Sequence, residues 1–410
     1  MSKFLTVFCG LLLFASPLYA QDNKVYIGEN DTIRYSYTPL QTDSIPASQP
    51  SDTLAAAPKK KSFWRRLIDY FGESSTDKTF EKKIDFTFAG GPSYSKNTSF
   101  GIGLLAAGLY RLDRTDSITS PSDISIFGSV SVSGFYALGV TGNTIFSRNK
   151  RRIDYTVMFS SAPRSLWGIG YNAGRYNPES TYSEKHYLVE GRYLHEFLPH
   201  AYIGGLVSFE HTRGLKFTQP EYLRGEKLKY TATGVGAILE YDSRDFIPNP
   251  FRGIYVSFQE TLFPKGLGNC DKTLWRTTFT ADAYQRVWKD GVLAADLYGV
   301  FNSDGTPWPM LARMGGSQRM RGYYQGRYTD NDMITVQVEL RQRIWRRIGC
   351  TVWGGAGNVF NSLDRFDWSE TLPNYGVGLR WELKKRVNVR LDYGFGKKTS
   401  GFLLSLNEAF

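Results

Sequence analysis

The sequence predicts an all-β protein built as a 16-stranded antiparallel transmembrane β-barrel. Three observations predict this fold: an export signal at the N-terminus, a two-residue alternation of apolar and polar side chains from residue 82 onward, and strands of ten residues or more. Tilted strands of about ten residues match a bilayer, whereas soluble strands more often have five or six. Because the apolar outer face and the polar inner face cancel, the mean hydropathy of −0.35 also fits a barrel.

Residues 1–20 are predicted to be a secretory signal peptide. The segment MSKFLTVFCGLLLFASPLYA carries Lys3, then a short apolar run and a polar break, with cleavage expected after Ala20. A membrane anchor is the alternative, but the apolar run is short for a span. The mature chain keeps only Cys270 and Cys350, too few for a disulfide framework.

Residues 21–81 are predicted to form a periplasmic tail with an amphipathic helix at about residues 59–75. The first part of the tail is rich in Ser, Pro and Ala and has no periodicity, as in disordered segments. In KKKSFWRRLIDYFGESS the apolar residues fall mostly on one helical face, with Lys and Arg beside them. Such a helix lies on a membrane surface or packs against the next domain, and the sequence leaves both alternatives open.

The barrel is expected to span residues 82–410. Residues 334–344 show its pattern, with apolar side chains on one face and Thr, Gln, Glu and Arg on the other. The count of strands is even, as in single-chain bacterial barrels. The expected strands are 84–95, 100–112, 122–133, 136–147, 151–162, 183–195, 201–212, 229–243, 252–264, 272–288, 291–303, 332–346, 348–360, 373–384, 386–396 and 401–410.

Short and long connections alternate along the chain. The segments SRNKR, HEFLPHA, VWKDG, RRIG and KKRV are short and occur at every second connection, as periplasmic turns do in outer-membrane barrels. The longer connections would then lie at the outer end. One of these, GGSQRMRGYYQGRYTDND at residues 315–332, is rich in Gly, Arg and Tyr. Long connections without regular structure are often functional, so this segment is a candidate site.

Three separated pieces of the chain resemble the bacterial surface antigen superfamily, whose members include the BamA and TamA barrels. Two of them are Met320-Arg321-Gly322-Tyr323 in the long connection and GLRWELKKRVNVRLDYGFG before the Phe-terminated last strand. The third is the turn EYDSRDFIPNPFRGIYVSF, which contains Asp242, Arg244, Asp245, Pro250 and Gly253. The resemblance covers roughly residues 82–410 and implies insertion or translocation of outer-membrane proteins.

The resemblance implies that the long connection folds into the barrel and that its arginine contacts an acidic residue of the inner wall. Glu339 lies at the matching position and points inward by strand parity. A planar guanidinium suits a carboxylate in bidentate fashion. We therefore expect a latch between loop and wall, formed by Arg321, Gly322, Tyr323 and Glu339. The second acid that the family often carries on the next strand is replaced by Gly355, and a solvated arginine in an outer loop is the alternative.

A lateral seam is expected between the first and last strands. The first strand holds Gly90, Gly91 and Pro92, and glycine weakens a strand while proline offers no N–H to a ladder. In the last strand, GFLLSLNEAF, the alternation places Phe410 on the lipid-facing side. Weak pairing would let the seam open sideways, as the family's insertion mechanism requires. Alternatively, Gly-Gly-Pro ends a short first strand.

The chain is not expected to be an enzyme. G-x-S-x-G, H-E-x-x-H and Cys/His metal spacings are absent, so no catalytic, cofactor or metal site is predicted. The net charge of +11 is spread over inward strand positions, turns and one cluster, so nucleic acid is not an expected partner. Outer-membrane lipid, client proteins, and further copies or partner subunits are the expected partners.

About sixty residues separate the signal peptide from the barrel, too few for the periplasmic POTRA domain that members of the superfamily carry. Three hypotheses stay open: an assembly or translocation barrel acting without its own POTRA domains, a gated or passive transport pore, and a structural barrel subunit of an envelope complex. Each places the barrel in the outer membrane of a Gram-negative bacterium, with the N-terminal tail in the periplasm.

Overall fold

The computed structural model describes residues 79–410 except 96–98, 117, 248 and 385–386. The predicted signal peptide, the amphipathic helix and nearly all of the predicted tail lie outside the described residues. Within the described part of the chain, no helix combines the length and the apolar character needed to cross a membrane.

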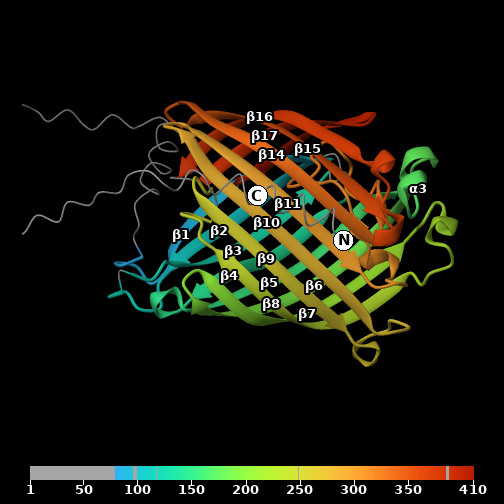
Figure 1. The fold of residues 1–410 in the computed structure, drawn as a ribbon, viewed down its shortest axis with the longest axis horizontal. Coiled ribbons are helices and arrows are strands. Elements are labelled where there is room, and N and C mark those ends of the chain that lie inside the picture. Colours follow the sequence, from blue (N-terminus) through green and yellow to red (C-terminus); the bar gives the residue numbers. More distant parts are fainter. Residues whose placement is uncertain (1–78, 96–98, 117, 248, 385–386) are drawn as a thin grey trace, which may run out of the picture. The chain divides into compact units, whose positions relative to one another are not determined.

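Sixteen strands form one sheet in chain order, each antiparallel to the next (Figure 1). The fold prediction is confirmed, since the observed strands match the expected ones to within a few residues, apart from the end of the last strand. They are β1 (Asp85–Ser95), β2 (Ser99–Tyr110), β3 (Ser122–Ser131), β4 (Tyr136–Ile145), β5 (Arg151–Leu166), β6 (Ser180–Leu198), β7 (Ala201–Leu215), β8 (Lys229–Asp242), β9 (Gly253–Phe263), β10 (Leu274–Trp288), β11 (Gly291–Asn302), β14 (Asp332–Trp345), β15 (Ile348–Phe360), β16 (Leu372–Lys384), β17 (Val387–Gly396) and β18 (Thr399–Leu406).

The sheet curls into a barrel whose two edge strands, β1 and β18, lie side by side. Within the part of the chain that the structure describes, no ladder register joins these two strands. The wall alternates as the sequence predicts. On β16, Tyr375, Val377 and Leu379 are more than half exposed, whereas the inward Asn374 and Arg380 are at most 5% exposed. The exposed apolar face is the one that lipid covers.

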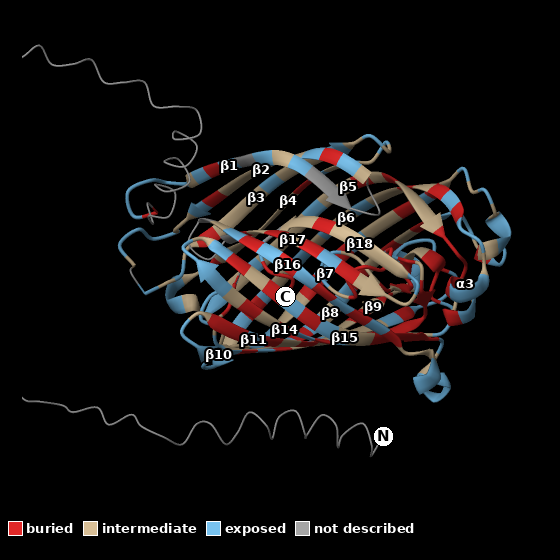
Figure 2. Ribbon diagram, turned by 90° about the horizontal axis from the view of Figure 1, so that it is seen from above, coloured by how far each residue is buried: buried red, intermediate tan, exposed pale blue. Residues whose placement is uncertain are grey.

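The connections differ strongly between the two ends of the barrel. At one end, which we call the short-turn end, β6–β7, β10–β11 and β14–β15 are joined by tight turns. The opposite, long-loop end carries α3 (Tyr171–Tyr176) between β5 and β6, η2 (Pro220–Leu223) between β7 and β8, and the segment between β11 and β14. Buried residues gather at this end, around α3 (Figure 2). The lumen is therefore filled mainly at the long-loop end.

The C-terminal residues correct one prediction. The sequence pattern places Phe410 on the lipid-facing side of the last strand, but β18 ends at Leu406. Asn407 has a φ of 60°, a left-handed conformation that asparagine tolerates better than most residues, and it reverses the parity of the chain. Residues 408–410 consequently turn into the lumen, where Arg341 Nη2 donates a 2.9 Å hydrogen bond to the main-chain oxygen of Phe410.

Candidate functional site

The segment between β11 and β14, residues 303–331, folds into the lumen and forms the candidate site. It contains η4 (Trp308–Met310) and two short strands, β12 (Ala312–Arg313) and β13 (Thr329–Asp330). These strands pair with each other, Ala312 opposite Asp330, so the stretch between them forms a closed hairpin. We call residues 312–330 the lumen loop. Because its base is paired, the arginines and tyrosines at its tip are held at defined positions.

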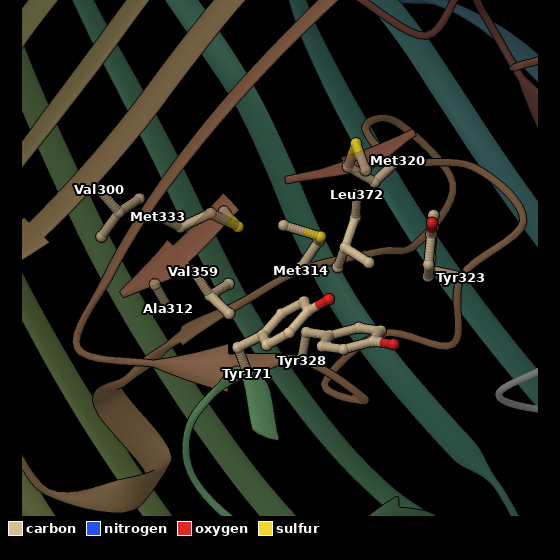
Figure 3. Packing of buried hydrophobic residues seen from close by; sticks show 10 residues of the cluster. All are labelled: Tyr171, Val300, Ala312, Met314, Met320, Tyr323, Tyr328, Met333, Val359 and Leu372. Carbon is tan, nitrogen blue, oxygen red and sulfur yellow. The ribbon is translucent and has the colours of Figure 1, made fainter. Parts of the chain in front are cut away.

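Apolar packing fixes the lumen loop against the inner wall. Its four large contributors, Met314, Met320, Tyr323 and Tyr328, are at most 3% exposed. They pack with α3 and with β11, β14, β15 and β16 in one cluster (Figure 3), which consists of Tyr171, Val300, Ala312, Met314, Met320, Tyr323, Tyr328, Met333, Val359 and Leu372. Each large apolar side chain that is fully buried contributes about 1.5–3 kcal/mol, so the cluster holds the loop firmly.

At the tip of the loop, the guanidinium of Arg321 is fully buried between two acidic residues. Its Nη2 lies 2.5 Å from Glu339 Oε2 on β14, and its Nη1 lies 2.9 Å from Asp392 Oδ2 on β17. Glu339 and Asp392 are also fully buried. The sequence predicts one bidentate pair, whereas the structure divides the guanidinium between two carboxylates. One cation therefore connects the loop to two strands of the wall.

Asp392 was missed as a site residue from the sequence. The family pattern directed attention to Gly355 on β15, whereas the second acid stands two strands further on. Strand parity carries the signal, because Asp392 alternates with the outward Leu391 and Tyr393. β15 contributes Trp353 instead of an acid, and its ring centroid lies 3.6 Å from the Arg321 guanidinium carbon. A cation over an indole face is a favourable contact, worth about 2 kcal/mol when desolvated.

The latch is the centre of a larger buried network of charges. Arg341 Nε lies 2.7 Å from Glu339 Oε1, and Arg380 Nη1 lies 2.6 Å from Asp392 Oδ1. Arg390 Nη1 lies 3.3 Å from Asp392 Oδ2. The network also reaches the C-terminal tail, since Glu408 lies 2.8 Å from Arg380. With four arginines and three acids, each carboxylate faces more than one cation, which compensates for burial far better than a single pair does.

Gly322 and Tyr323 complete the contact with β17. Gly322 has a φ of 104°, and a Cβ atom there would stand 2.6 Å from the backbone of Gly394 on β17. Conversely, a Cβ at Gly394 would stand 2.4 Å from the carbonyl oxygen of Arg321. The Tyr323 hydroxyl donates to the carbonyl of Pro373 and accepts from the backbone N–H of Lys397, both at 2.7 Å. The loop backbone therefore lies directly on the wall, which only glycines allow.

Two further arginines tie the lumen loop to other strands. Arg319 makes a bidentate contact with Asp296 on β11, with distances of 2.6–3.0 Å, and its guanidinium carbon lies 4.0 Å from the ring centroid of Tyr298. Arg313 lies 3.0 Å from Glu184 on β6. Through its arginines, the loop thus contacts β6, β11, β14 and β17 on the inner wall.

Residues 129–410 match the model of the Omp85 superfamily domain. The chain belongs to the Omp85 superfamily. Barrels of this superfamily are outer-membrane proteins of Gram-negative bacteria that serve in transport and assembly. No curated protein matches the chain in a sequence comparison.

Solved structures show the same fold at low sequence identity. The Omp85 chain resembles BamA from Haemophilus ducreyi lacking POTRA domains 1–3, with a TM-score of 0.53 and 12% identity over 80% of this chain and 70% of that one. It also resembles CdiB from Acinetobacter baumannii, with a TM-score of 0.53 and 10% identity over 80% of this chain and 60% of that one. The likeness to CdiB from Escherichia coli has a TM-score of 0.55 and 12% identity over 79% of this chain and 62% of that one. The chain therefore spans less than two thirds of either CdiB chain.

The predicted turn motif of this Omp85 chain joins β8 to β9 at the short-turn end. Arg244 forms a bidentate contact with Asp242, at 2.8 and 2.7 Å, and stacks over the ring of Tyr255. Asp245 Oδ1 accepts from the backbone N–H of Phe251 at 2.9 Å. Gly253 has a φ of 111°, and a Cβ there would stand 2.3 Å from the Ser243 carbonyl oxygen. Pro250 is buried in this turn, and all these contacts join the turn to itself or to the adjoining ends of β8 and β9, which indicates a structural role for the motif.

The predicted seam residues lie in two different places, three of them within β1 and one inside the lumen. Gly90, Gly91 and Pro92 lie inside β1, which continues to Ser95 in full register with β2. The alternative in which Gly-Gly-Pro ends the first strand is therefore wrong. Phe410, by contrast, lies inside the barrel, away from the lipid-facing edge.

Among the described residues, no group of three or more His, Cys, Asp or Glu side chains is placed to hold a metal. The buried acids of the lumen are instead arranged around arginines, as in the latch. Cys270 is buried and Cys350 partly buried, both as free thiols. The polar chemistry of the described site is that of ion pairs holding a loop.

Proposed function

We propose that this Omp85 barrel inserts or translocates outer-membrane polypeptides, with the edge between β1 and β18 as the lateral exit. The observation that carries the proposal is the Arg321 latch between Glu339 and Asp392. It holds the lumen loop on β14–β17, so the C-terminal wall is rigid up to the strand next to β18. Opening would then occur at the junction of the two edge strands, without disturbing the latch.

The two edge strands support this location of the exit. Pro92 has no N–H to offer to a neighbouring strand, and Gly90 and Gly91 add no side-chain packing. β18 has only eight residues, against 11 in β1, because the chain turns inward at Asn407. A short strand beside a proline-containing strand forms a weak junction, which suits an exit that opens and recloses.

The filled lumen disfavours the alternative of a passive pore. The lumen loop and its apolar cluster occupy the long-loop end, and its arginines connect β6, β11, β14 and β17. A pore would need this loop to leave the lumen, which would expose the buried charges of the latch. We therefore expect low single-channel conductance from the purified protein, and a wide, open channel would favour the pore.

We further propose that the barrel acts within a complex or an oligomer. Members of the superfamily work with partner proteins, which supports a partner subunit or a second copy as the receiver of clients. Purification in mild detergent, with identification of copurifying proteins, tests it. A barrel that purifies alone and monomeric, yet is active, would contradict it.

Depletion in the native host, followed by quantitative mass spectrometry of the outer membrane, tests the proposed function. Levels of several β-barrel proteins should fall, and wild-type protein should restore them, whereas Arg321→Ala should restore them poorly. Arg213→Gln, a change at an exposed position of β7, is the matched control and should restore them fully. Unchanged levels of every barrel protein after depletion would refute insertion as the function.

A further inference from the structure

A cavity of about 370 Å³ opens at the short-turn end of the lumen, away from the lumen loop. The turns β10–β11 and β14–β15 form its rim, and inward residues of β14, β16 and β17 form its floor. Its charged residues are basic Arg286, Lys289, Arg341, Arg343, Arg347 and Arg380, and acidic Asp290, Glu382 and Glu408. Arg341 and Arg380 are already matched by the buried acids of the latch network. The excess of positive charge therefore comes from the four basic groups at the rim. Cavities of this size are typical of ligand sites, and the charge selects an anion.

The chain's own C-terminal tail contributes Glu408 to the lining of this cavity. The Glu408 carboxylate accepts hydrogen bonds from Arg380 Nε at 2.8 Å and from Asn388 Nδ2 at 2.6 Å. The ring centroid of Phe410 lies 5.3 Å from the Arg341 guanidinium carbon and 6.3 Å from the ring centroid of Tyr284. Arg380 and Asn388 of the cavity floor thus already bind a carboxylate of the chain itself.

The rim remains basic after the nearby acids are matched. Asp290 pairs with Arg343, Glu408 is held by Arg380 on the floor, and Glu382 and Arg347 each have a partner as well. The four rim cations Arg286, Lys289, Arg343 and Arg347 still outnumber the two rim acids Asp290 and Glu382. Arg286 stacks over the ring of Phe251, with 4.8 Å between guanidinium carbon and centroid. Lys289 and Arg343 are exposed at the mouth, where an incoming ligand would meet them first.

The position of the cavity decides between a peptide and a lipid. Arg286, Arg341, Arg343 and Arg380 have the inward parity of their strands, so their charges face the lumen. A phospholipid whose acyl chains remain in the bilayer is separated from them by the wall. A polypeptide segment can enter through the mouth along the axis of the barrel, as the tail of the chain itself does from β18.

We propose that this cavity binds an acidic peptide segment of a second polypeptide, which enters at the short-turn end and lies beside the C-terminal tail. Carboxylates of the segment are bound by Lys289, Arg343 and Arg347 at the rim and compete with Glu408 for the floor. The proposal goes beyond the proposed function and does not depend on it, because peptide binding is measured on the purified barrel without any insertion reaction.

Fluorescence anisotropy with the purified full chain in detergent tests the proposal, using labelled octaglutamate and octaglutamine peptides as probes. Octaglutamate should bind, more weakly as salt rises, and octaglutamine should not. The triple rim variant Lys289→Gln, Arg343→Gln, Arg347→Gln should weaken binding about tenfold, whereas the matched control Arg213→Gln, Lys216→Gln, Lys229→Gln at the long-loop end should bind like the wild type. Heat-modified migration in gels verifies that each variant is folded.

A second variant tests the sharing of the site with the tail. Glu408→Gln removes the competing carboxylate and should tighten octaglutamate binding, the opposite of the rim variant. Equal weakening by the rim and control variants, or binding of octaglutamine, would overturn the proposal. So would unchanged or weaker binding by Glu408→Gln. Glycerophosphoglycerol, a phospholipid head group without acyl chains, should displace the peptide poorly. If glycerophosphoglycerol instead binds as tightly as octaglutamate, the cavity is a phosphate site and the proposal is wrong.

Discussion

The inner faces of β3 and β14 differ sharply in burial, although both are central strands of the same barrel. On β14, the inward Thr335, Gln337, Glu339 and Arg341 are between 0 and 6% exposed. On β3, the inward Asp123, Ser125, Phe127 and Ser129 all remain partly exposed. The difference has one cause, since the lumen loop and the C-terminal tail lie on the C-terminal wall, β14–β17, and leave the N-terminal wall, β1–β4, uncovered.

The barrel therefore has two parts that are held together in different ways. The C-terminal wall, the loop and the tail are joined by buried ion pairs and by backbone contacts. The N-terminal wall is held mainly by its ladders and by the lipid on its outer face. Regions with few buried contacts open at lower free energy than densely packed regions. Movement at the junction of β1 and β18 is therefore expected to displace β1–β4 rather than β14–β17.

Removal of the Arg321 side chain should destabilise the C-terminal wall more than any other single change. Arg321→Ala removes the cation that joins the loop to Glu339 and Asp392, which keep only the arginines of the wall. Breaking a buried ion pair costs about 3–5 kcal/mol. Urea titration followed by tryptophan fluorescence measures the loss of stability, and trypsin cleavage at Arg327 measures release of the loop. Arg321→Lys keeps the charge but cannot reach both acids, so its stability should lie between that of the wild type and that of Arg321→Ala. Wild-type stability in Arg321→Ala would show that the apolar cluster alone holds the loop.

Loss of the second acid should have the next largest effect. Asp392→Asn removes a carboxylate that faces Arg321, Arg380 and Arg390, and leaves these cations to Glu339 and Glu408. We expect a loss of about 3 kcal/mol in the same titration, because the remaining buried positive charge is poorly compensated. If Asp392→Asn loses no more stability than removal of an exposed charge does, Glu339 alone holds Arg321.

A pair of glycine substitutions compares the two walls directly. Gly394→Ala on β17 places a methyl group 2.4 Å from the Arg321 carbonyl oxygen, and such overpacking costs about 1–3 kcal/mol. In Gly91→Ala on β1 the new methyl group meets no heavy atom within 4 Å. Thermal unfolding should therefore separate the two variants, with Gly91→Ala close to the wild type. Equal destabilisation would contradict a loop that leaves the N-terminal wall uncovered.

The smallest effect is expected in the turn between β10 and β11, outside both walls. Asp290 pairs with Arg343, whose side chain is 57% exposed, and such exposed pairs contribute little. The hydrogen bond from Arg343 lowers the pKa of Asp290 below its ordinary value. Any contribution of the Asp290–Arg343 pair to stability is thus present at neutral pH and is lost as the pH falls through the lowered pKa of Asp290. Asp290→Asn should unfold like the wild type at pH 7, and a clear destabilisation would reveal an unrecognised role of this turn.

The sequence predicts the strands well because each strand carries a period-two pattern that a bilayer enforces on both faces. Parity alone placed Glu339 inward, and the structure brings it to Arg321. The same rule would have found Asp392, had every inward acid of the C-terminal strands been considered rather than one motif position. The position of Phe410 was wrong because parity holds only while the strand continues. A single left-handed residue, Asn407, reverses it, and asparagine near a strand end is the signal for this.

The inward turn at Asn407 also has a practical consequence. With Phe410 inside the lumen, residues appended after it would emerge within the lumen rather than into free solvent. A fused affinity tag would have to thread past Arg341 and the rim, or pull the last four residues out of place. Purification handles and fluorescent reporters therefore belong on exposed loops at the opposite end of the cylinder.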